Sequence, residues 1–195
     1  MTAFRIVIAV ILLVAAVAAV LLLSGVYNVG ADAPHWPWVE RVAQAIRNAS
    51  IASRAEDLRA PDLTQPQLIA QGAEHYAAMC PDCHLAPGME ESDLRKGLYP
   101  RPPDLRKATH ADPNWQFWVI KHGIKMSAMP AWGATHDDQA IWGIVAFLQK
   151  LPSLSVEQYQ QLTGNQARAT HGAEHHHDAG DSSAPSDHGK DSHRH

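Results

Sequence analysis

Apolar and polar positions divide the 195-residue chain into segments of different kinds. Residues 6–23 are an unbroken run of 18 apolar side chains, mostly Val, Leu, Ile and Ala. This length is enough for a helix that crosses a lipid bilayer. Arg5 and the amino terminus precede the run, and positive charge favours the cytoplasmic side. The pattern therefore predicts a single-pass anchor, with the rest of the chain on the opposite side of the membrane.

A cleaved signal peptide is the alternative, because Val29, Gly30 and Ala31 resemble a small-residue cleavage site. Signal peptides usually have a shorter apolar core, of about 7–15 residues. The length of the run therefore favours a retained anchor over residues 1–31. Either interpretation exports the rest of the chain.

Residues 38–54 show the apolar spacing of an amphipathic helix, with Val39, Val42 and Ile46 on its apolar side. Trp36 and Trp38 stand at its start, and such aromatic side chains are common at the level of lipid headgroups. The helix falls within a linker that we assign to residues 32–63. Three interpretations stay open: contact with the membrane, contact with a partner subunit, or a linker without a specific partner.

Three further helices are predicted downstream. Thr64 and Gln67 have the spacing of a capping box, with Pro66 in the first turn, and that helix extends to about Met79. A second helix begins after Asp112 and ends before Gly123. A third is predicted from the capping pair Thr135 and Asp138 to about Leu151, with apolar residues every three or four positions.

The only two cysteines of the chain lie in Cys80-Pro81-Asp82-Cys83-His84. Cys-x-x-Cys-His is the attachment signature of c-type haem. The two thiols are close enough to add across the two vinyl groups of one porphyrin, and the adjacent imidazole can then bind the iron. A structural disulfide or a redox pair would not need the histidine. A zinc site would need further soft ligands, and the chain has no other cysteine.

A second iron ligand is expected from the loop Gly123–Gly133, which is rich in Met, Gly and Pro. A thioether on this loop could close the far face of the haem. Met129 and Met126 are the two candidates. The alternative role for Met126 is packing at the edge of the haem, and either side chain could otherwise be hydrophobic filler.

With these motifs, residues 65–152 resemble class I cytochromes c, in particular small membrane-anchored ones. The resemblance implies an all-α fold around one covalent haem, with His84 and Met129 as axial ligands, since the family's distal Met precedes a Pro, here Pro130. It implies that the Pro103 carbonyl accepts a hydrogen bond from His84 and that Leu105 packs on the haem. It also implies that Gly72 and Tyr76 meet the C-terminal helix at Ile144 and Phe147.

Residues 154–195 are predicted to be a disordered tail. Seven of the 13 histidines lie within residues 171–195, among Asp, Gly and Ser and without apolar periodicity. Neutral imidazole is a ligand that Cu, Ni and Zn favour, so His175, His176 and His177 are candidate ligands for these metals. A solubilising tail with incidental metal affinity is the alternative.

The predicted organisation is thus an anchor (1–31), a linker helix (32–63), a haem domain (64–153) and a tail (154–195). The charge is mild, with 16 Lys and Arg against 20 Asp and Glu, and gives no basis for expecting nucleic acid. We expect a monohaem electron carrier rather than an enzyme, in the bacterial inner membrane with its haem domain in the periplasm, exchanging electrons with respiratory partners. A subunit of a dehydrogenase or terminal oxidase and a metal-handling protein are the alternatives.

Overall fold

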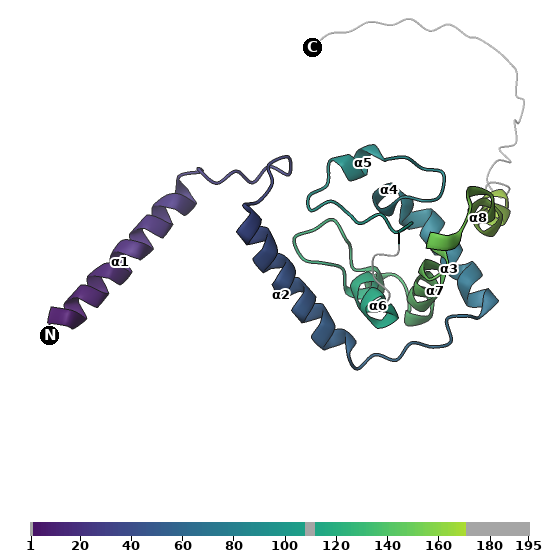
Figure 1. The fold of residues 1–195 in the computed structure, drawn as a ribbon, viewed down its shortest axis with the longest axis horizontal. Helices are drawn as coiled ribbons and strands as arrows, with labels where there is room; N and C mark the ends of the chain where they lie inside the picture. Colours follow the sequence, from purple (N-terminus) through teal and green to yellow (C-terminus); the bar gives the residue numbers. More distant parts are fainter. Residues whose placement is uncertain (1, 108–111, 171–195) are drawn as a thin grey trace, which may run out of the picture.

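The structure is a computed structural model that describes residues 2–107 and 112–170, the last six of these as backbone only. Over these residues it is built from helices and loops and has no β-strand (Figure 1). The elements are α1 (Thr2–Leu23), α2 (Pro37–Ala55), α3 (Pro66–Met79), α4 (Pro81–His84), α5 (Asp93–Lys96), α6 (Pro113–His122), the 3₁₀ turn η1 (Trp132–Ala134), α7 (Asp138–Leu148), the 3₁₀ turn η2 (Leu151–Ser153) and α8 (Val156–Thr170). The predicted all-α fold is confirmed.

Helix α1 contains the predicted apolar run and begins four residues earlier, at Thr2. None of its residues is buried in the molecule. Its length and composition suffice to cross a membrane, although the same test is passed by a signal sequence. An apolar helix that is not covered by the rest of the molecule is expected to lie in another apolar environment, such as lipid.

The core of the domain forms where α3 crosses α7. A Cβ atom placed on Gly72 of α3 would lie 1.8 Å from the Gly143 carbonyl oxygen of α7, so only a glycine permits this approach. One turn later, the rings of Tyr76 and Phe147 lie 5.2 Å apart, and both side chains are fully buried. The predicted contact between Gly72 and Tyr76 on one helix and Ile144 and Phe147 on the other is confirmed.

Helix α6 packs beside α7 and buries Phe117 and Ile120. The ring of Phe117 stacks on Trp142 of α7, with centroids 4.1 Å apart. The predicted start and end of α6 are confirmed. Asp112 accepts a hydrogen bond from the Asn114 amide, and Gly123 follows the last turn with a φ of +66°.

Two predicted caps are wrong. The side chain of Thr64 donates to Asp62 and does not cap α3, which begins after Gln65 with Pro66 in its first position. Helix α7 is capped by Asp137, which accepts from the Ala140 amide, whereas Thr135 donates to the Trp132 carbonyl. In both cases the threonine hydroxyl makes a local hydrogen bond outside the helix and is not used as its cap. Thr and Asp side chains often form such local turns.

The prediction of disorder is wrong for residues 156–170, because η2 ends at Ser153 and α8 follows at Val156. The rest of the predicted tail, residues 171–195, lies outside the described residues. The signal was present in the sequence: Ser155 and Gln158 form a reciprocal capping box, with bonds of 2.9 and 3.2 Å. Tyr159 and Leu162 are partly buried against the core. Helix α8 contacts α3, but it carries too few apolar side chains to show a clear periodicity in the sequence.

Candidate haem site

The Cys-x-x-Cys-His segment forms its own helical turn directly after α3. Cys80 ends α3, and its carbonyl accepts from the amides of Cys83 and His84 at 3.2 and 2.9 Å. The two cysteines are therefore one helical turn apart, directly after the C-terminal end of α3. Both are free thiols, as attachment to a porphyrin requires.

Burial raises the pKa of the Cys80 thiol to about 12. Burial also raises the pKa of Cys83, with a further contribution from the charge of Asp82. Reactive redox pairs depend on a cysteine whose pKa is lowered, because the thiolate is the attacking species. Here the pKa values of both thiols are raised, which disfavours a thioredoxin-like pair.

The ring of His84 is held by a backbone carbonyl. Its Nδ1 lies 2.9 Å from the Pro103 oxygen, the contact that the family resemblance implied. A carbonyl only accepts hydrogen bonds, so Nδ1 carries the proton and Nε2 keeps a free lone pair. Burial also lowers the pKa of the ring and so favours the neutral form. Such a bond orients an imidazole for a metal and increases its basicity.

Leu85, directly after the histidine, has an unusual backbone. Its φ of +66° and ψ of 163° are normally adopted only by glycine. The side chain is buried, and its carbonyl accepts a 2.5 Å hydrogen bond from the fully buried Tyr76 hydroxyl. The predicted role of Tyr76 was packing alone. The structure adds a polar contact that holds the turn after His84.

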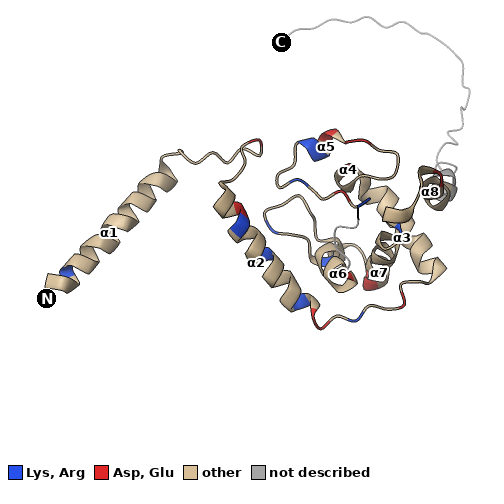
Figure 2. Ribbon diagram, viewed as in Figure 1, with Lys and Arg blue, Asp and Glu red and all other residues tan. Residues whose placement is uncertain are grey.

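Charged residues around α5 brace the proline-rich loop that carries Pro103, a feature that the sequence pattern did not reveal. Arg95 is buried, pairs with Glu91 at 2.9 Å and donates to the Pro102 carbonyl at 3.2 Å. Arg101 contacts the same Glu91 carboxylate. Arg106 pairs with Asp104 at 2.7 Å. Figure 2 shows this gathering of both signs of charge around α5.

The two candidate methionines differ sharply. Met126 is completely exposed at the tip of its loop, with a φ of +57°. Met129 is partly buried against the hydrophobic core. The loop is closed by a 3.2 Å bond from the Ile124 amide to the Met129 carbonyl, and a Cβ on Gly123 would lie 2.7 Å from that oxygen. The geometry therefore favours Met129 over Met126 as an inward-facing thioether.

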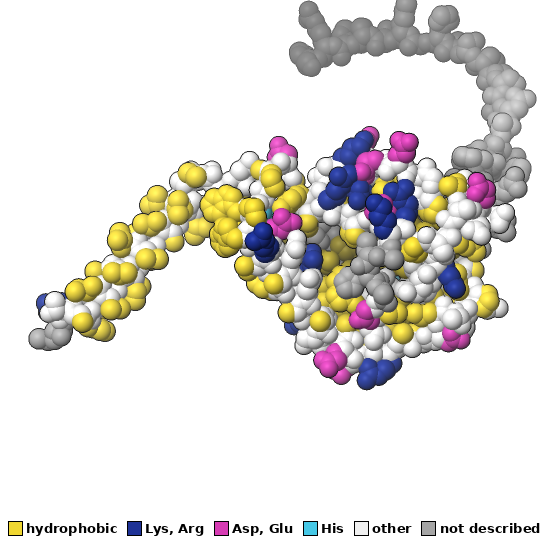
Figure 3. All heavy atoms as spheres, in the orientation of Figure 1, with side chains coloured by type: hydrophobic (Ala, Val, Ile, Leu, Met, Phe, Trp, Pro, Cys, Tyr) yellow, Lys and Arg dark blue, Asp and Glu magenta, His cyan; other side chains and the backbone are white. Residues whose placement is uncertain are grey.

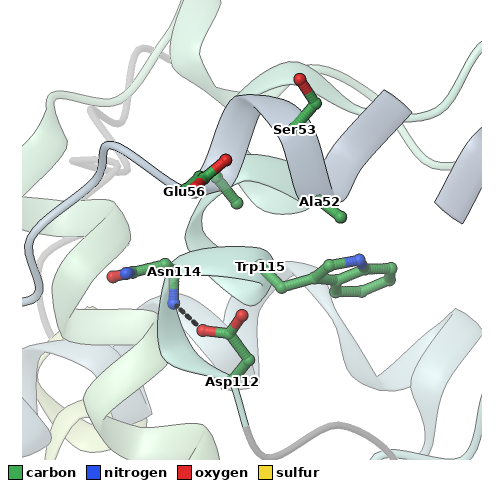
Figure 4. A pocket seen from close by; sticks show the side chains of 7 residues that line it. Ala52, Ser53, Glu56, Asp112, Asn114 and Trp115 are labelled. Carbon is green, nitrogen blue, oxygen red and sulfur yellow. Dashed lines mark hydrogen bonds between the residues drawn. The ribbon is translucent and has the colours of Figure 1, made fainter. Parts of the chain in front are cut away.

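A cavity of about 500 Å³ opens elsewhere, between the end of α2 and the start of α6. Figure 4 shows its lining, with Ala52 and Ser53 on one side and Asp112, Asn114 and Trp115 on the other. None of the predicted haem ligands lines it. We assign it no part in the site.

The fold and the motif agree with a comparison to known families. Residues 67–148 match the family model described as cytochrome C oxidase, cbb3-type, subunit III. These residues form a cytochrome c domain. The chain is therefore a haem-based electron-transfer protein, and the domain implies a covalent haem c. No curated protein matches the chain.

The side chains present fit the group that a cytochrome c domain implies. Two unpaired thiols lie one helical turn apart, a neighbouring imidazole keeps a free Nε2, and one thioether faces inward. Among residues 2–107 and 112–170 there is no group of three or more His, Cys, Asp or Glu that could hold a separate metal ion. The candidate tail ligands His175, His176 and His177 lie outside the described residues.

Proposed function

We propose that this protein is a membrane-anchored monohaem cytochrome c that carries single electrons between respiratory partners. The haem would be attached to Cys80 and Cys83 and ligated by His84 and Met129. When bound, the haem iron supplies the Fe(III)/Fe(II) couple. Helix α1 would hold the protein in the bacterial inner membrane, with the domain in the periplasm.

One observation carries the ligand assignment: the 2.9 Å contact of His84 Nδ1 with Pro103 leaves Nε2 free beside two unpaired thiols. The partly buried Met129 supports a second thioether ligand. If His84 and Met129 both held the iron, no open position would remain for a substrate, which would favour electron transfer over catalysis. A thioether ligand stabilises the ferrous state relative to a second imidazole.

The attachment is tested by denaturing electrophoresis of purified protein followed by staining for haem. Haem should stay with the polypeptide, and Cys80→Ala or Cys83→Ala should sharply reduce the yield of holoprotein. Ser24→Ala, in the segment after α1, is the control and should leave the yield unchanged. Extraction of all haem by acidified acetone would exclude covalent attachment.

The distal ligand is tested on the oxidised protein, where Met ligation to Fe(III) gives a weak far-red charge-transfer band in this family. Met129→Ala should abolish the band and let the reduced iron bind carbon monoxide. Met126→Ala is the matched control and should change neither property, because that side chain is completely exposed. The reverse pattern would assign the ligand to Met126.

Retention of α1 is tested by washing membranes with high salt and then with carbonate. The holoprotein should stay in the membrane fraction, and its intact mass should include residues 1–31. A mature protein that begins near Asp32 would show that α1 is a cleaved signal sequence.

A second candidate function is that of an electron-transfer subunit in a terminal oxidase complex. The match of residues 67–148 to the family of cbb3-type oxidase subunit III favours it. Purification in mild detergent distinguishes the two: a subunit should elute with oxidase polypeptides, whereas a free carrier should elute alone.

A further inference from the structure

Helix α2 presents apolar side chains on two different sides. Ile51 and Ala55, near its C-terminal end, are buried. Trp38, Val42 and Ile46 follow one another at intervals of four residues and are 61%, 51% and 66% exposed. At about 100° per residue these three lie roughly 140–180° around the helix axis from Ile51. Figure 3 shows hydrophobic side chains gathered at the N-terminal end of α2.

The outer stripe is defined as Trp38, Val42 and Ile46, and each of these side chains is more than half exposed. Trp38 lies beside Trp36, with ring centroids 6.3 Å apart, at the start of the same helix. The stripe's flanking positions Ala45 and Ala49 are small and also exposed, so the stripe is continuous and carries no charge. The charged and amide residues of the N-terminal half lie on another side, where Glu40 pairs with Gln44 at 3.0 Å. An amphipathic helix whose apolar side faces solvent marks an interaction surface.

Helix α2 is fastened to the cytochrome c domain at both ends. At its start, the His35 amide donates to the Tyr99 hydroxyl at 3.1 Å, and the two rings lie 5.2 Å apart. At its end, Ile51 and Ala55 are buried, and the Asn114 side chain of α6 donates to the Leu58 carbonyl at 3.0 Å. The helix is therefore held against the domain by contacts at both of its ends.

The path from α1 to α2 is short. Residues 24–36 separate the two helices. A 2.9 Å bond between the Tyr27 hydroxyl and His35 Nδ1 closes residues 27–35 into a loop. Only residues 24–26 then lie between α1 and the closed loop, and only Trp36 between that loop and α2. If α1 spans the membrane, the start of α2 lies within a few residues of its surface.

We propose that the outer stripe of α2 lies in the lipid headgroup region and holds the cytochrome c domain in one orientation against the membrane. This inference rests on the proposed anchoring by α1. Trp36 and Trp38 stand at the end nearest α1, and tryptophan is favoured at membrane interfaces. Arg41, Arg47 and Arg54 outnumber the single acid Glu40 on the helix (Figure 2), which suits an anionic lipid surface.

The consequence concerns the search for redox partners. A domain on a flexible tether would present its haem in all directions. A domain fixed through α2 keeps α6, and the loop that carries Tyr99 and Pro103, at a constant height above the lipid. The domain then diffuses in the plane of the membrane and meets redox partners embedded in the same membrane in one orientation.

The test uses full-length holoprotein in vesicles of phosphatidylethanolamine and phosphatidylglycerol. A nitroxide is attached at Val42→Cys or Ile46→Cys, and at Gln44→Cys as the matched control on the polar side. Accessibility to oxygen, which concentrates in lipid, is compared with accessibility to a water-soluble nickel chelate. The labels at residues 42 and 46 should collide mainly with oxygen, and the label at residue 44 mainly with nickel.

Two results would overturn the proposal. Equal nickel accessibility at all three positions would mean that the stripe is in water. Protection from both reagents would mean that the stripe is covered by protein, and spin–spin broadening would identify a second copy. Hydroxyl-radical footprinting of the unsubstituted protein gives a second measure: Trp38 should be protected in vesicles while Met126 is modified, and rapid modification of both would refute contact with lipid.

The same preparations separate this inference from the proposed function. Intact mass reports whether residues 1–31 are retained. Covalent attachment of haem leaves the introduced cysteine as the only thiol that can be labelled, so labelling of three thiols would show that the haem assignment had failed. A retained anchor, one labelled thiol and a stripe in water would refute the α2 proposal alone.

Discussion

The contact between α3 and α7 at Gly72 gives the sharpest prediction about stability. In Gly72→Ala the new Cβ would lie 1.8 Å from the Gly143 carbonyl oxygen and 2.2 Å from its carbon. Ordinary contact begins near 3.4 Å, so the helices must separate by more than 1 Å. Both atoms are backbone, and neither can move aside by rotation of a side chain. The separation would also loosen the contact between Tyr76 and Phe147.

The magnitude follows from two opposing terms. Alanine favours a helix over glycine by about 1 kcal/mol. Overpacking of a core costs about 1–3 kcal/mol, and more when the backbone must shift. We expect the overpacking cost to lie at the upper end of its range, because the clash is between backbone atoms of the main helix pair, and the net loss is then about 2 kcal/mol. For a domain of this size, that corresponds to a fall in Tm of roughly 8–16 °C.

The assay is denaturant unfolding of the holoprotein, followed by far-ultraviolet circular dichroism. Gly97→Ala is the matched control, because the nearest atom to its new Cβ would be 3.7 Å away. It should change the free energy of unfolding by less than about 0.5 kcal/mol. Gly143→Ala, with a nearest contact of 3.2 Å, should fall between the two. A Gly72→Ala protein as stable as the Gly97→Ala protein would refute the close approach of α3 and α7.

Three other predictions follow from particular contacts. Tyr76→Phe leaves the buried Leu85 carbonyl without its donor and should cost about 1–3 kcal/mol in the same unfolding assay, whereas an unchanged midpoint would mean that water replaces the hydroxyl. Asp104→Asn removes the charged partner of Arg106 and should lower the free energy of unfolding by about 1 kcal/mol at pH 7. The hydrogen bond from Arg106 lowers the pKa of the Asp104 carboxyl below its ordinary 3.8, so the stability that it gives is present above that value and is lost as the pH falls below it. Wild type and variant should therefore converge in strong acid, and a gap that persists there would exclude the ion pair as its source. Truncation after Thr170 should remove Cu, Ni and Zn binding measured by calorimetry and leave the visible spectrum unchanged, and equal metal binding by the truncated protein would exclude the tail as the binding site.

Local patterns in the sequence were sufficient for much of this protein. The apolar run of α1, the ends of α6 and the Cys-x-x-Cys-His segment each depend on residues that are near neighbours in the chain. Helix α8, from Val156 to Thr170, shows where such reasoning failed. The capping box of Ser155 was present, but α8 places few apolar side chains against the domain, and a helix with so little periodicity resembles a polar tail in the sequence.

The site itself depended on contacts between distant residues. The resemblance to cytochromes c pointed to Pro103 and Met129, but the position of each relative to His84 and to the core is a product of folding. Arg95 and Glu91 lie in a polar stretch of the sequence, yet Arg95 is buried and donates a hydrogen bond to the proline-rich loop. The pattern of polar residues along the chain does not show which charged side chains are buried by a loop that follows them in the sequence.

By itself the sequence determined the apolar span, the long helices that precede α8 and the chemistry of the haem motif, because these follow from spacing within a few turns. The tertiary structure alone decided that Met129 faces inward while Met126 faces solvent, and that α2 is fastened to the domain at both ends. The reason is physical: a side chain's burial depends on what packs against it, and the partners of Met129, Tyr76 and Ile51 come from segments far away in the chain.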